Sequence, residues 1–455
     1  MARRHMSVIF NGLLACCFSK IEASISGSTL KIKNFVVLVL FIFFSSASFA
    51  HSEVCVVPLQ LVNIGSNDDP HFKLGINVGL GGGQPRLYEF DTGGPAFWAA
   101  YNANLSQKDQ WWGATQLVSA NSMSLKYTSG NHYTANLVKT NISFYQPKET
   151  QASNSLCSSN LPININQITT YTDSDPKKVD EWNKCLNEGC APLEKKFWGD
   201  FGAALFPVNN IYNSAGAYTV LPQVFVSHRF PFTGSNQGFI VHVGKIDSNY
   251  VPVSQPYVQI GFTAQDQSSF KYFFPMNRFC ANISSSNQCN FLPWYSYSTV
   301  YTQPFSEQLF NAQVTITSND IGNQILSPIG VTMDTGAPGA TIWQISGSTV
   351  DKNYLKDPSL ITGNPTPIYS GIFKDNESLF VSPLINNVTQ PPKFILLQTN
   401  TPVKQTIDAN MHAADAPNAK IPYVNTGIFL FTEWDVLYDI SSGLIGFRPA
   451  NTSSP

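Results

Sequence analysis

The segment 87–98 reads LYEFDTGGPAFW, and the segment 331–343 reads VTMDTGAPGATIW. Each copy is an apolar run that ends in Asp-Thr-Gly, continues through small residues and proline, and closes on a tryptophan. A single Asp-Thr-Gly could simply end a strand, because aspartate and glycine are ordinary turn residues. Two copies with matching flanks, centred on Asp91 and Asp334, lie too far apart for a solenoid repeat. They predict two similar lobes that each bring one strand end to a shared cleft.

Paired carboxylates at such a cleft have a chemistry of their own. Two like charges a few ångströms apart do not both ionise readily, so Asp91 and Asp334 would hold one proton between them. The ionised member can accept a proton from water while the protonated member polarises the substrate. The glycine after each Asp-Thr pair permits a sharp turn, and the threonine hydroxyl can brace that turn by a hydrogen bond. The pattern therefore indicates general acid–base hydrolysis.

At these two motifs the chain resembles the pepsin-like aspartic peptidases, which carry two such motifs in one chain. The resemblance implies an all-β, bilobal pepsin-like acid-protease fold, with two pseudo-symmetric barrel-like lobes around a cleft. It implies Asp91 and Asp334 as the catalytic pair and an extended polypeptide as the substrate. The supporting residues that we expect are Thr92, Gly93, Thr335, Gly336, Tyr127 and Trp98. The competing interpretation is a purely structural use of both motifs.

A hairpin is predicted over residues 123–138, where two alternating arms flank a Ser-Gly-Asn turn. In the peptidase family a hairpin flap at this place covers the cleft, and its tyrosine corresponds to Tyr127. The match is incomplete, since Thr128 stands where the family usually has a glycine. The alternative is a plain surface hairpin with a half-buried tyrosine, because aromatic residues favour strands in any case.

Composition and charge exclude several classes of protein. The 455 residues are 43% hydrophobic and only 12% charged, with a net charge of −2. Sparse and nearly balanced charge argues against a nucleic-acid partner and against electrostatic binding to a membrane surface. No spacing of cysteine and histidine predicts a metal site. We expect no metal, no cofactor and a monomer.

The first 50 residues are predicted to be a leader and a signal peptide. A basic flank at 31–34 is followed by an apolar run at 35–44 and by small residues that end at Ala50. We expect cleavage after Ala50, no stable membrane span afterwards, and a secreted or periplasmic protein. The alternative is a membrane anchor, although the apolar run is short for a span.

Six cysteines follow the predicted cleavage site, and an even number in an exported chain suggests disulfides. The short spacings predict the pairs Cys185–Cys190 and Cys280–Cys289. Elimination then leaves Cys55–Cys157 as the third pair.

The remaining sequence divides into three predicted parts. We expect a short N-terminal segment over 51–70, an N-terminal lobe over 71–250 and a C-terminal lobe over 251–455. Within the first lobe, the polar stretch 145–198 reads as a surface insertion with a short helix. A hairpin from residue 72 to residue 90 is predicted to deliver Asp91, and a strand over 329–333 to deliver Asp334.

Four residues depart from the family pattern. The family often has a hydroxyl residue directly after Asp-Thr-Gly that helps to hold the carboxylate, but this chain has Gly94 and Ala337. The strand before Gly427 should carry two apolar residues and instead carries Asn425 and Thr426. These changes leave both aspartates in place but put their pKa values in question.

Two functions fit these observations. The first is an exported endopeptidase that works best at acid pH and prefers substrates that fill apolar pockets. The second is a non-catalytic binding or inhibitor-like protein on the same scaffold, which the altered neighbours of the aspartates favour. The two intact aspartates favour the enzyme, because a buried pair of charges is costly to keep.

Overall fold

The structure, a computed structural model, describes residues 54–66, 68–94, 96–106, 110–127, 130–159, 161–204, 236–275, 280–283, 289–291, 312–362, 367–383, 393–397, 407–411, 422–439, 442 and 444–450. The predicted leader and signal peptide lie outside these residues. The side chains of Cys280 and Cys289 also lie outside the described residues, and so does the predicted Cys280–Cys289 pair. Ser52–Pro455 is one compact unit. No helix among the described residues has the length and apolar character needed to cross a membrane.

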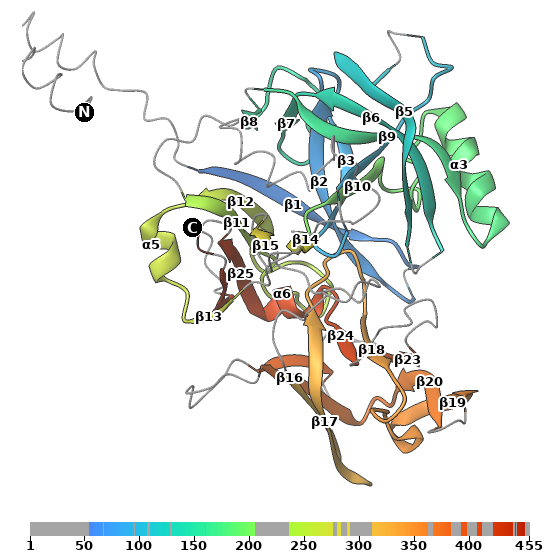
Figure 1. Cartoon of the computed structure of the whole chain (residues 1–455), viewed down its shortest axis with the longest axis vertical. Helices are drawn as coiled ribbons and strands as arrows, with labels where there is room; N and C mark the ends of the chain where they lie inside the picture. The colour runs from blue at the N-terminus through green and yellow to red at the C-terminus, as the bar shows by residue number, and fades with distance from the viewer. Residues whose placement is uncertain are drawn as a thin grey trace, which may run out of the picture. The chain divides into compact units, whose positions relative to one another are not determined.

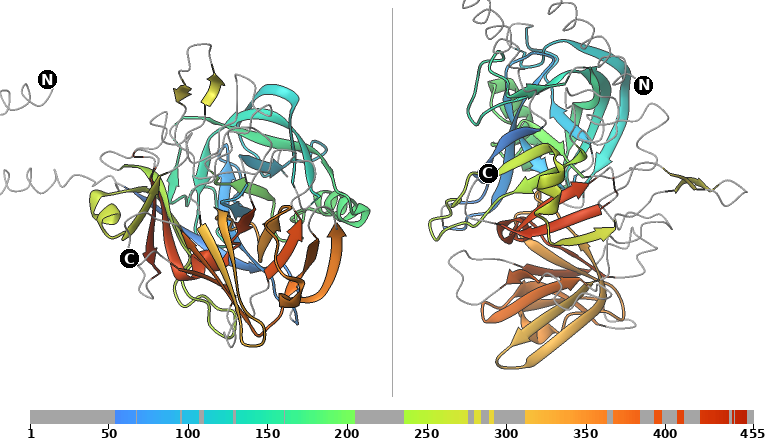
Figure 2. Two further views of the ribbon diagram at one scale, coloured as in Figure 1. Left: turned by 60° about the horizontal axis from the view of Figure 1, so that its bottom comes forward. Right: turned by 90° about the vertical axis from the view of Figure 1, so that its left-hand side faces the viewer.

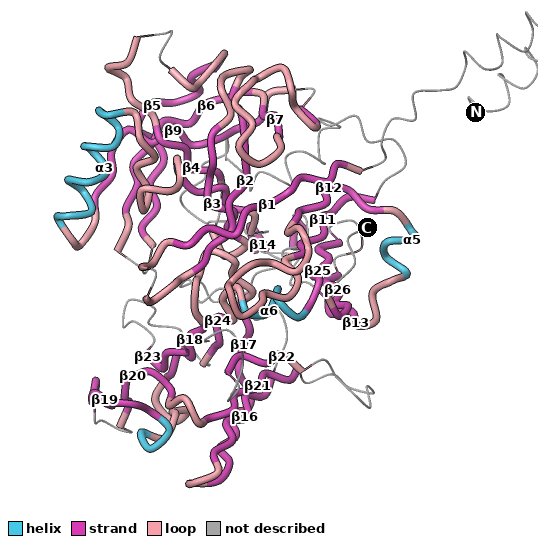
Figure 3. Tube along the Cα trace, turned by 180° about the vertical axis from the view of Figure 1, so that it is seen from behind, coloured by secondary structure: helices cyan, strands magenta, loops and turns pink. Residues whose placement is uncertain are grey.

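Strands dominate the described part of the chain (Figure 3). Its helices are short: α3 (Pro176–Glu188), α5 (Ala264–Ser268), α6 (Phe429–Glu433) and a 3-10 turn at Lys352–Tyr354. The strands form two large sheets and one small hairpin. The predicted all-β architecture is therefore confirmed.

The larger sheet has 15 strands in the order β13-β26-β25-β11-β12-β1-β2-β3-β10-β4-β9-β6-β5, with β7 paired to β2 and β8 paired to β7 (Figure 1). Its strands are β1 (Cys55–Asn63), β2 (Phe72–Leu80), β3 (Arg86–Asp91), β4 (Phe97–Ala100), β5 (Thr115–Lys126), β6 (His132–Thr140), β7 (Ile142–Phe144), β8 (Cys157–Ser158), β9 (Ile163–Thr172), β10 (Gly199–Gly202), β11 (Asn236–His242), β12 (Tyr257–Phe262), β13 (Tyr272–Pro275), β25 (Trp434–Asp439) and β26 (Leu444–Pro449). Strands from both predicted lobes share this sheet, since β12 pairs with β1 and β11. The predicted boundary near residue 250 stays a prediction.

The second large sheet has 9 strands in the order β19-β20-β23-β18-β24-β17-β16-β21-β22. Its strands are β16 (Ala312–Ser318), β17 (Gly322–Thr332), β18 (Ala340–Gln344), β19 (Leu355–Thr362), β20 (Ile368–Phe373), β21 (Glu377–Pro383), β22 (Phe394–Leu397), β23 (Ile407–Met411) and β24 (Tyr423–Asn425). The hairpin of β14 (Cys280–Ile283) and β15 (Cys289–Phe291) stands apart from both sheets in the two views of Figure 2.

The hairpin of β2 and β3 delivers Asp91, as predicted. Leu74, Ile76 and Val78 alternate along β2 and are fully buried, because a period of two sends every second side chain to one face. The chain turns at Gly81 and Gly82, whose φ values of 61° and 79° favour glycine. Burial of the apolar face and glycine in the turn together fix the register that places Asp91 at the strand end.

The two Asp-Thr-Gly strands have the same neighbours. β3 runs parallel to β10, and β10 pairs antiparallel with β4. In the same way β17 runs parallel to β24, and β24 pairs antiparallel with β18. In each half the parallel partner therefore lies between the strand that leads to the aspartate and the strand that leaves its loop, which is the two-fold repeat expected of a pepsin-like fold.

The segment 145–198 differs from its prediction as a surface insertion. Residues Ile163–Thr172 form β9, which pairs antiparallel with β6 and parallel with β4 inside the 15-stranded sheet. Ile163, Ile165 and Ile168 on this strand are buried, so this part of the segment belongs to the core. Polar residues within and around this strand hid its few apolar residues, which are buried. Only α3, which ends at Glu188, matches the predicted short helix.

Two disulfides occur in the described residues, and both are pairs expected from the sequence. Cys55–Cys157 links β1 to β8 across a sequence separation of 102 residues. Cys185–Cys190 closes the C-terminal end of α3. The long-range bridge therefore fastens the first strand of the unit to the edge of the sheet.

Candidate active site

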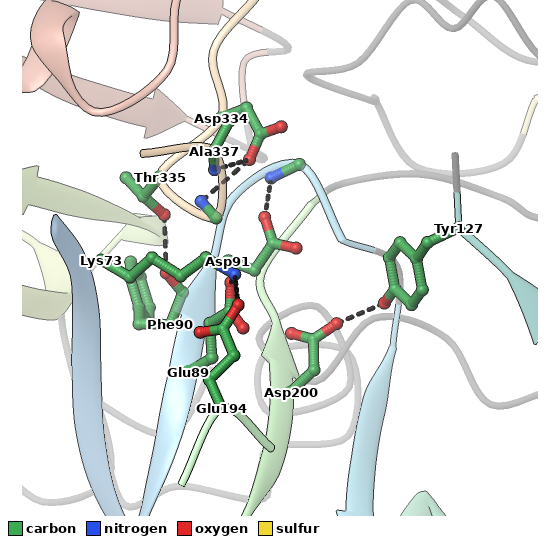
Figure 4. A network of polar contacts seen from close by, with 12 residues as sticks. Lys73, Glu89, Phe90, Asp91, Tyr127, Glu194, Asp200, Asp334, Thr335 and Ala337 are labelled. Atoms are coloured by element: carbon green, nitrogen blue, oxygen red, sulfur yellow. Dashed lines mark hydrogen bonds and ion pairs between the residues drawn. The ribbon is translucent and has the colours of Figure 1, made fainter. Parts of the chain in front are cut away.

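The two Asp-Thr-Gly loops grip each other through their threonines. The Thr92 amide donates to Thr335 Oγ1 at 2.9 Å, and the Thr335 amide donates to Thr92 Oγ1 at 3.0 Å. Each hydroxyl then donates to a backbone carbonyl of the opposite strand, Thr92 to Met333 at 3.0 Å and Thr335 to Phe90 at 2.7 Å (Figure 4 draws the second). Both threonines are buried. These four bonds satisfy every polar group of the grip and fix the two loops face to face.

The grip brings each carboxylate against the glycine of the other loop. A Cβ atom placed on Gly93 would lie 2.3 Å from Asp334 Cγ, and one on Gly336 would lie 2.4 Å from Asp91 Cγ. Only glycine leaves room for both carboxylates, because a contact below 3 Å is a clash. The sequence therefore predicted the residues that meet here, and the structure brings Asp91 and Asp334 together.

Asp334 is surrounded by hydrogen-bond donors. The amides of Gly336 and Ala337 donate to its Oδ1 at 2.8 and 3.1 Å. Asn425 Nδ2 donates to its Oδ2 at 2.6 Å, while the Asn425 Oδ1 accepts from the Gly427 amide at 2.9 Å and so fixes the amide orientation. Three donors favour the charged form of a carboxylate. Asn425, noted in the sequence as a departure, thus supplies the side-chain donor that Ala337 lacks.

Asp91 has the opposite surroundings. Its Oδ1 accepts a hydrogen bond from the Gly93 amide at 2.7 Å. Burial raises its pKa well above the usual value, and the negative charges of Asp334, Asp200 and Glu89 raise the pKa further. Figure 4 shows Asp91 between Asp334 on one side and Glu89 and Asp200 on the other. Burial and these neighbouring charges therefore favour the protonated form of Asp91.

Two further carboxylates flank Asp91 on its own sheet. Glu89 lies two residues earlier on β3 and hence on the same face, and Asp200 lies opposite Glu89 on the parallel strand β10. Burial raises the pKa of Glu89 to about 7, although the charge of Lys73 lowers it. Burial, then the charge of Glu89, raises the pKa of Asp200 well above its usual value. Sequence reasoning missed both residues.

A lysine compensates part of this charge. Lys73 Nζ lies 2.9 Å from Glu89 Oε1 and 2.9 Å from Glu194 Oε1 (Figure 4). Burial lowers the pKa of Lys73, but these two carboxylates more than offset that effect and raise it above the usual value. A signal was present in the sequence, since Glu89 is a charge between Tyr88 and Phe90 and lies two residues before Asp91, on the same face of the strand.

Tyr127 follows β5 directly, in the loop of the predicted hairpin of β5 and β6. Its hydroxyl donates a short hydrogen bond to Asp200 Oδ2 (Figure 4). Its ring stands edge-on to Tyr133 at 5.9 Å, and Tyr133 packs on the fully buried Trp98 at 5.8 Å. The structure thus places Tyr127 beside the carboxylates and Trp98 behind it as part of the core.

The surroundings of Gly94 explain why no hydroxyl residue follows the first motif. A Cβ atom on Gly94 would lie 2.4 Å from Asp91 Oδ2 and 3.0 Å from Asp200 Oδ2. A serine here would collide with the carboxylate that it normally supports. Glycine at this place therefore leaves room for the Asp91 carboxylate and, more loosely, for that of Asp200.

The site carries no arrangement suited to a metal. No group of three or more histidine, cysteine, aspartate or glutamate side chains within the described ranges could hold a metal ion.

Comparison with known proteins gives a distant similarity. Among 381 matching chains of solved structures is the aspartic proteinase from Irpex lacteus, with 13% sequence identity, 88% of this chain and 98% of that chain covered, and a TM-score of 0.48. No protein-family model and no curated protein matches the chain. Similarity at this level is no evidence for an activity, so any functional assignment depends on the residues described above.

Proposed function

We propose that this protein is an aspartic endopeptidase that hydrolyses peptide bonds with Asp91 and Asp334. The observation that carries the proposal is the reciprocal grip of Thr92 and Thr335, with each carboxylate seated against the glycine of the other loop. Such a grip buries two carboxyl groups side by side at a cost in solvation, which a purely structural contact would not need. The preorganised pair suits a reaction in which charge and a proton move between two carboxylates.

The unequal surroundings of the two aspartates assign their roles. Asp334, held by three donors, is the ionised member and takes a proton from a water molecule. The oxygen of that water bonds to the carbonyl carbon, while protonated Asp91 gives its proton to the carbonyl oxygen. Asp334 then gives its proton to the amide nitrogen, and the carbon–nitrogen bond breaks. Asp91 takes back a proton from a hydroxyl of the tetrahedral intermediate, and the products are a carboxylic acid and an amine.

The proposed substrate is an extended polypeptide bound in the cleft between the lobes, with Tyr127 on the hairpin beside it. The proposed location is outside the cytoplasm, secreted or periplasmic. Support comes from the disulfides Cys55–Cys157 and Cys185–Cys190, which are typical of oxidising compartments. The proposed chemistry uses no cofactor and no metal.

Hydrolysis of casein or denatured haemoglobin between pH 3 and pH 6 tests the proposal. Wild-type protein should cleave the substrate, and Asp91→Asn and Asp334→Asn should each reduce the rate by about a thousandfold, because each removes one partner of an acid–base pair. Asp180→Asn, at an exposed carboxylate on α3, is the matched control and should keep the wild-type rate.

An inhibitor that mimics the tetrahedral intermediate, such as pepstatin, separates the two candidate functions. Binding to the wild type and weaker binding to both Asp→Asn variants would support the enzyme. Absence of cleavage together with absence of inhibitor binding would reject the enzyme in favour of the non-catalytic binding protein that the sequence left open.

A further inference from the structure

A group of charged side chains lies beside Asp91, and none of them transfers a proton in the proposed reaction. We call Glu89, Asp200, Glu194 and Lys73 the acid cluster (Figure 4). Glu89 is 5% exposed and Asp200 is 3% exposed. Acidic residues at such burial are rare unless something pairs with them. Burial raises the pKa of both carboxyl groups, so their charged forms would be stabilised by a bound cation.

The charges within the cluster do not balance. Lys73 is its cation, and both of its close contacts are with Glu89 and Glu194. No ion pair to Asp200 occurs in the part of the chain that the structure describes. One oxygen of Asp200 accepts from Tyr127, but the buried Oδ1 has no hydrogen-bond partner among the described residues. A buried carboxylate oxygen without a donor is costly, and a bound donor would remove that cost.

The unpartnered carboxylate lies next to the reacting pair. A single point, the Cβ position built on Gly94, is 2.4 Å from Asp91 Oδ2 and 3.0 Å from Asp200 Oδ2. A group that reaches Asp200 must therefore belong to a part of the substrate close to the bond that is cleaved. The contact from Tyr127 comes from a hairpin loop rather than from the sheet, so this side of Asp200 is bounded by a loop.

We propose that Asp200, assisted by Glu89, binds the ammonium or guanidinium group of a lysine or arginine side chain adjacent to the scissile bond. The inference rests on the proposed peptidase function and names its substrate class. A cation with several N–H donors satisfies both the missing charge and the orphan oxygen of Asp200. The preference would be for basic residues, in place of the apolar preference expected from the low charge content of the sequence.

Matched peptides test the inference. In these peptides, lysine is matched with uncharged norleucine, and arginine with uncharged citrulline. Each residue is placed on either side of a single cleavable bond. Wild type should show a kcat/KM about 10- to 100-fold higher for the charged member of each pair, as expected for a hydrogen-bonded charge. In Asp200→Asn this ratio should fall towards one, while Asp180→Asn should keep the wild-type ratio.

The outcomes separate the two proposals. If the wild type cleaves none of the peptides and no protein substrate, the peptidase assignment fails. If it cleaves them, loses cleavage in Asp91→Asn, and shows no charge preference or an unchanged preference in Asp200→Asn, the peptidase stands and the basic subsite is wrong. Should Asp200→Asn not fold, wild-type inhibition constants for transition-state peptides with lysine or norleucine decide the point, and equal constants overturn the inference.

Discussion

At the scale of single residues, β10 and β24, which are the parallel partners of the two aspartate strands, differ at an equivalent position. Glu89 and Thr332 each stand two residues before an aspartate, and their parallel partners are Asp200 and Asn425. One half therefore carries a carboxylate where the other carries an amide. The amide stabilises charge on Asp334, and the carboxylate opposes charge on Asp91. Two side chains are enough to make a symmetric pair unequal.

Asn425 is expected to act as a positioning residue for Asp334. Asn425→Ala should lower kcat by about 10- to 100-fold with little change in KM, because it removes one hydrogen bond to a charged group. Asn425→Ser, which keeps a donor, should recover part of the loss. Asn323→Ala, at an exposed asparagine on β17 of the same sheet, serves as the control in steady-state assays. A loss in KM alone, or no recovery with serine, would contradict this role.

At the scale of secondary-structure elements, the ends of four strands position the two aspartates. β3 and β17 end at the grip, and β10 and β24 run parallel to them, so each aspartate is set by two neighbouring strands. A second link ties β11 to the last two strands: buried His242 on β11 contacts Asp435 on β25 at 2.6 Å, and Asp435 contacts Arg448 on β26 at 2.8 Å. Pairing between distant segments thus holds the site together.

The two disulfides should contribute unequally to stability. Cys55–Cys157 closes a loop with a separation of 102 residues, whereas Cys185–Cys190 closes one with a separation of 5. The chain-entropy model gives about 5 kcal/mol for the long loop and about 2 kcal/mol for the short one. Replacing each pair by alanines and measuring urea unfolding should therefore show the larger loss for Cys55→Ala with Cys157→Ala. A larger loss for the short pair would contradict the expectation.

At the scale of the whole molecule, the buried carboxylates link stability to pH. The pKa of Glu89 rises from 4.5 to about 7 on folding, and those of Asp91 and Asp200 also rise. The folded state therefore binds more protons than the unfolded state in this range. Their stabilising effect is complete below the unfolded values and is lost as the pH rises through the folded ones. Lys73, whose pKa is also raised, stays charged throughout and adds no slope.

We expect the free energy of unfolding to fall between pH 5 and pH 8. Glu89 alone accounts for about 3 kcal/mol by the usual conversion of a pKa shift. Urea titrations across this range should show a shallower fall for Glu89→Gln and for Asp200→Asn than for wild type. Asp180→Asn should leave the slope unchanged. Stability that increases from pH 5 to pH 8 would show that these groups do not carry the effect.

Several features could be predicted from the sequence alone. They are the pairing of the two aspartates, the hairpin that delivers the first of them, the all-β class and the cysteine pairs that the structure describes. The aspartates stand in a repeated motif, the hairpin has alternating apolar residues and turn glycines, and Cys185–Cys190 has a short spacing. Elimination left Cys55–Cys157, and the all-β class was implied by the resemblance. β9 escaped because its strand is surrounded by polar residues, and only its pairing with β4 and β6 reveals it.

The tertiary structure alone decided what surrounds the pair. Asn425 lies 91 residues from Asp334, and Tyr127 lies 73 residues from Asp200, so no local pattern could bring them together. Burial then set the pKa of Glu89 and Asp200, because a carboxyl titrates according to the charges and solvent around it and not according to its neighbours in sequence. The two aspartates could be found in the sequence, whereas the groups that raise the pKa of Asp91 are brought to it by long-range packing.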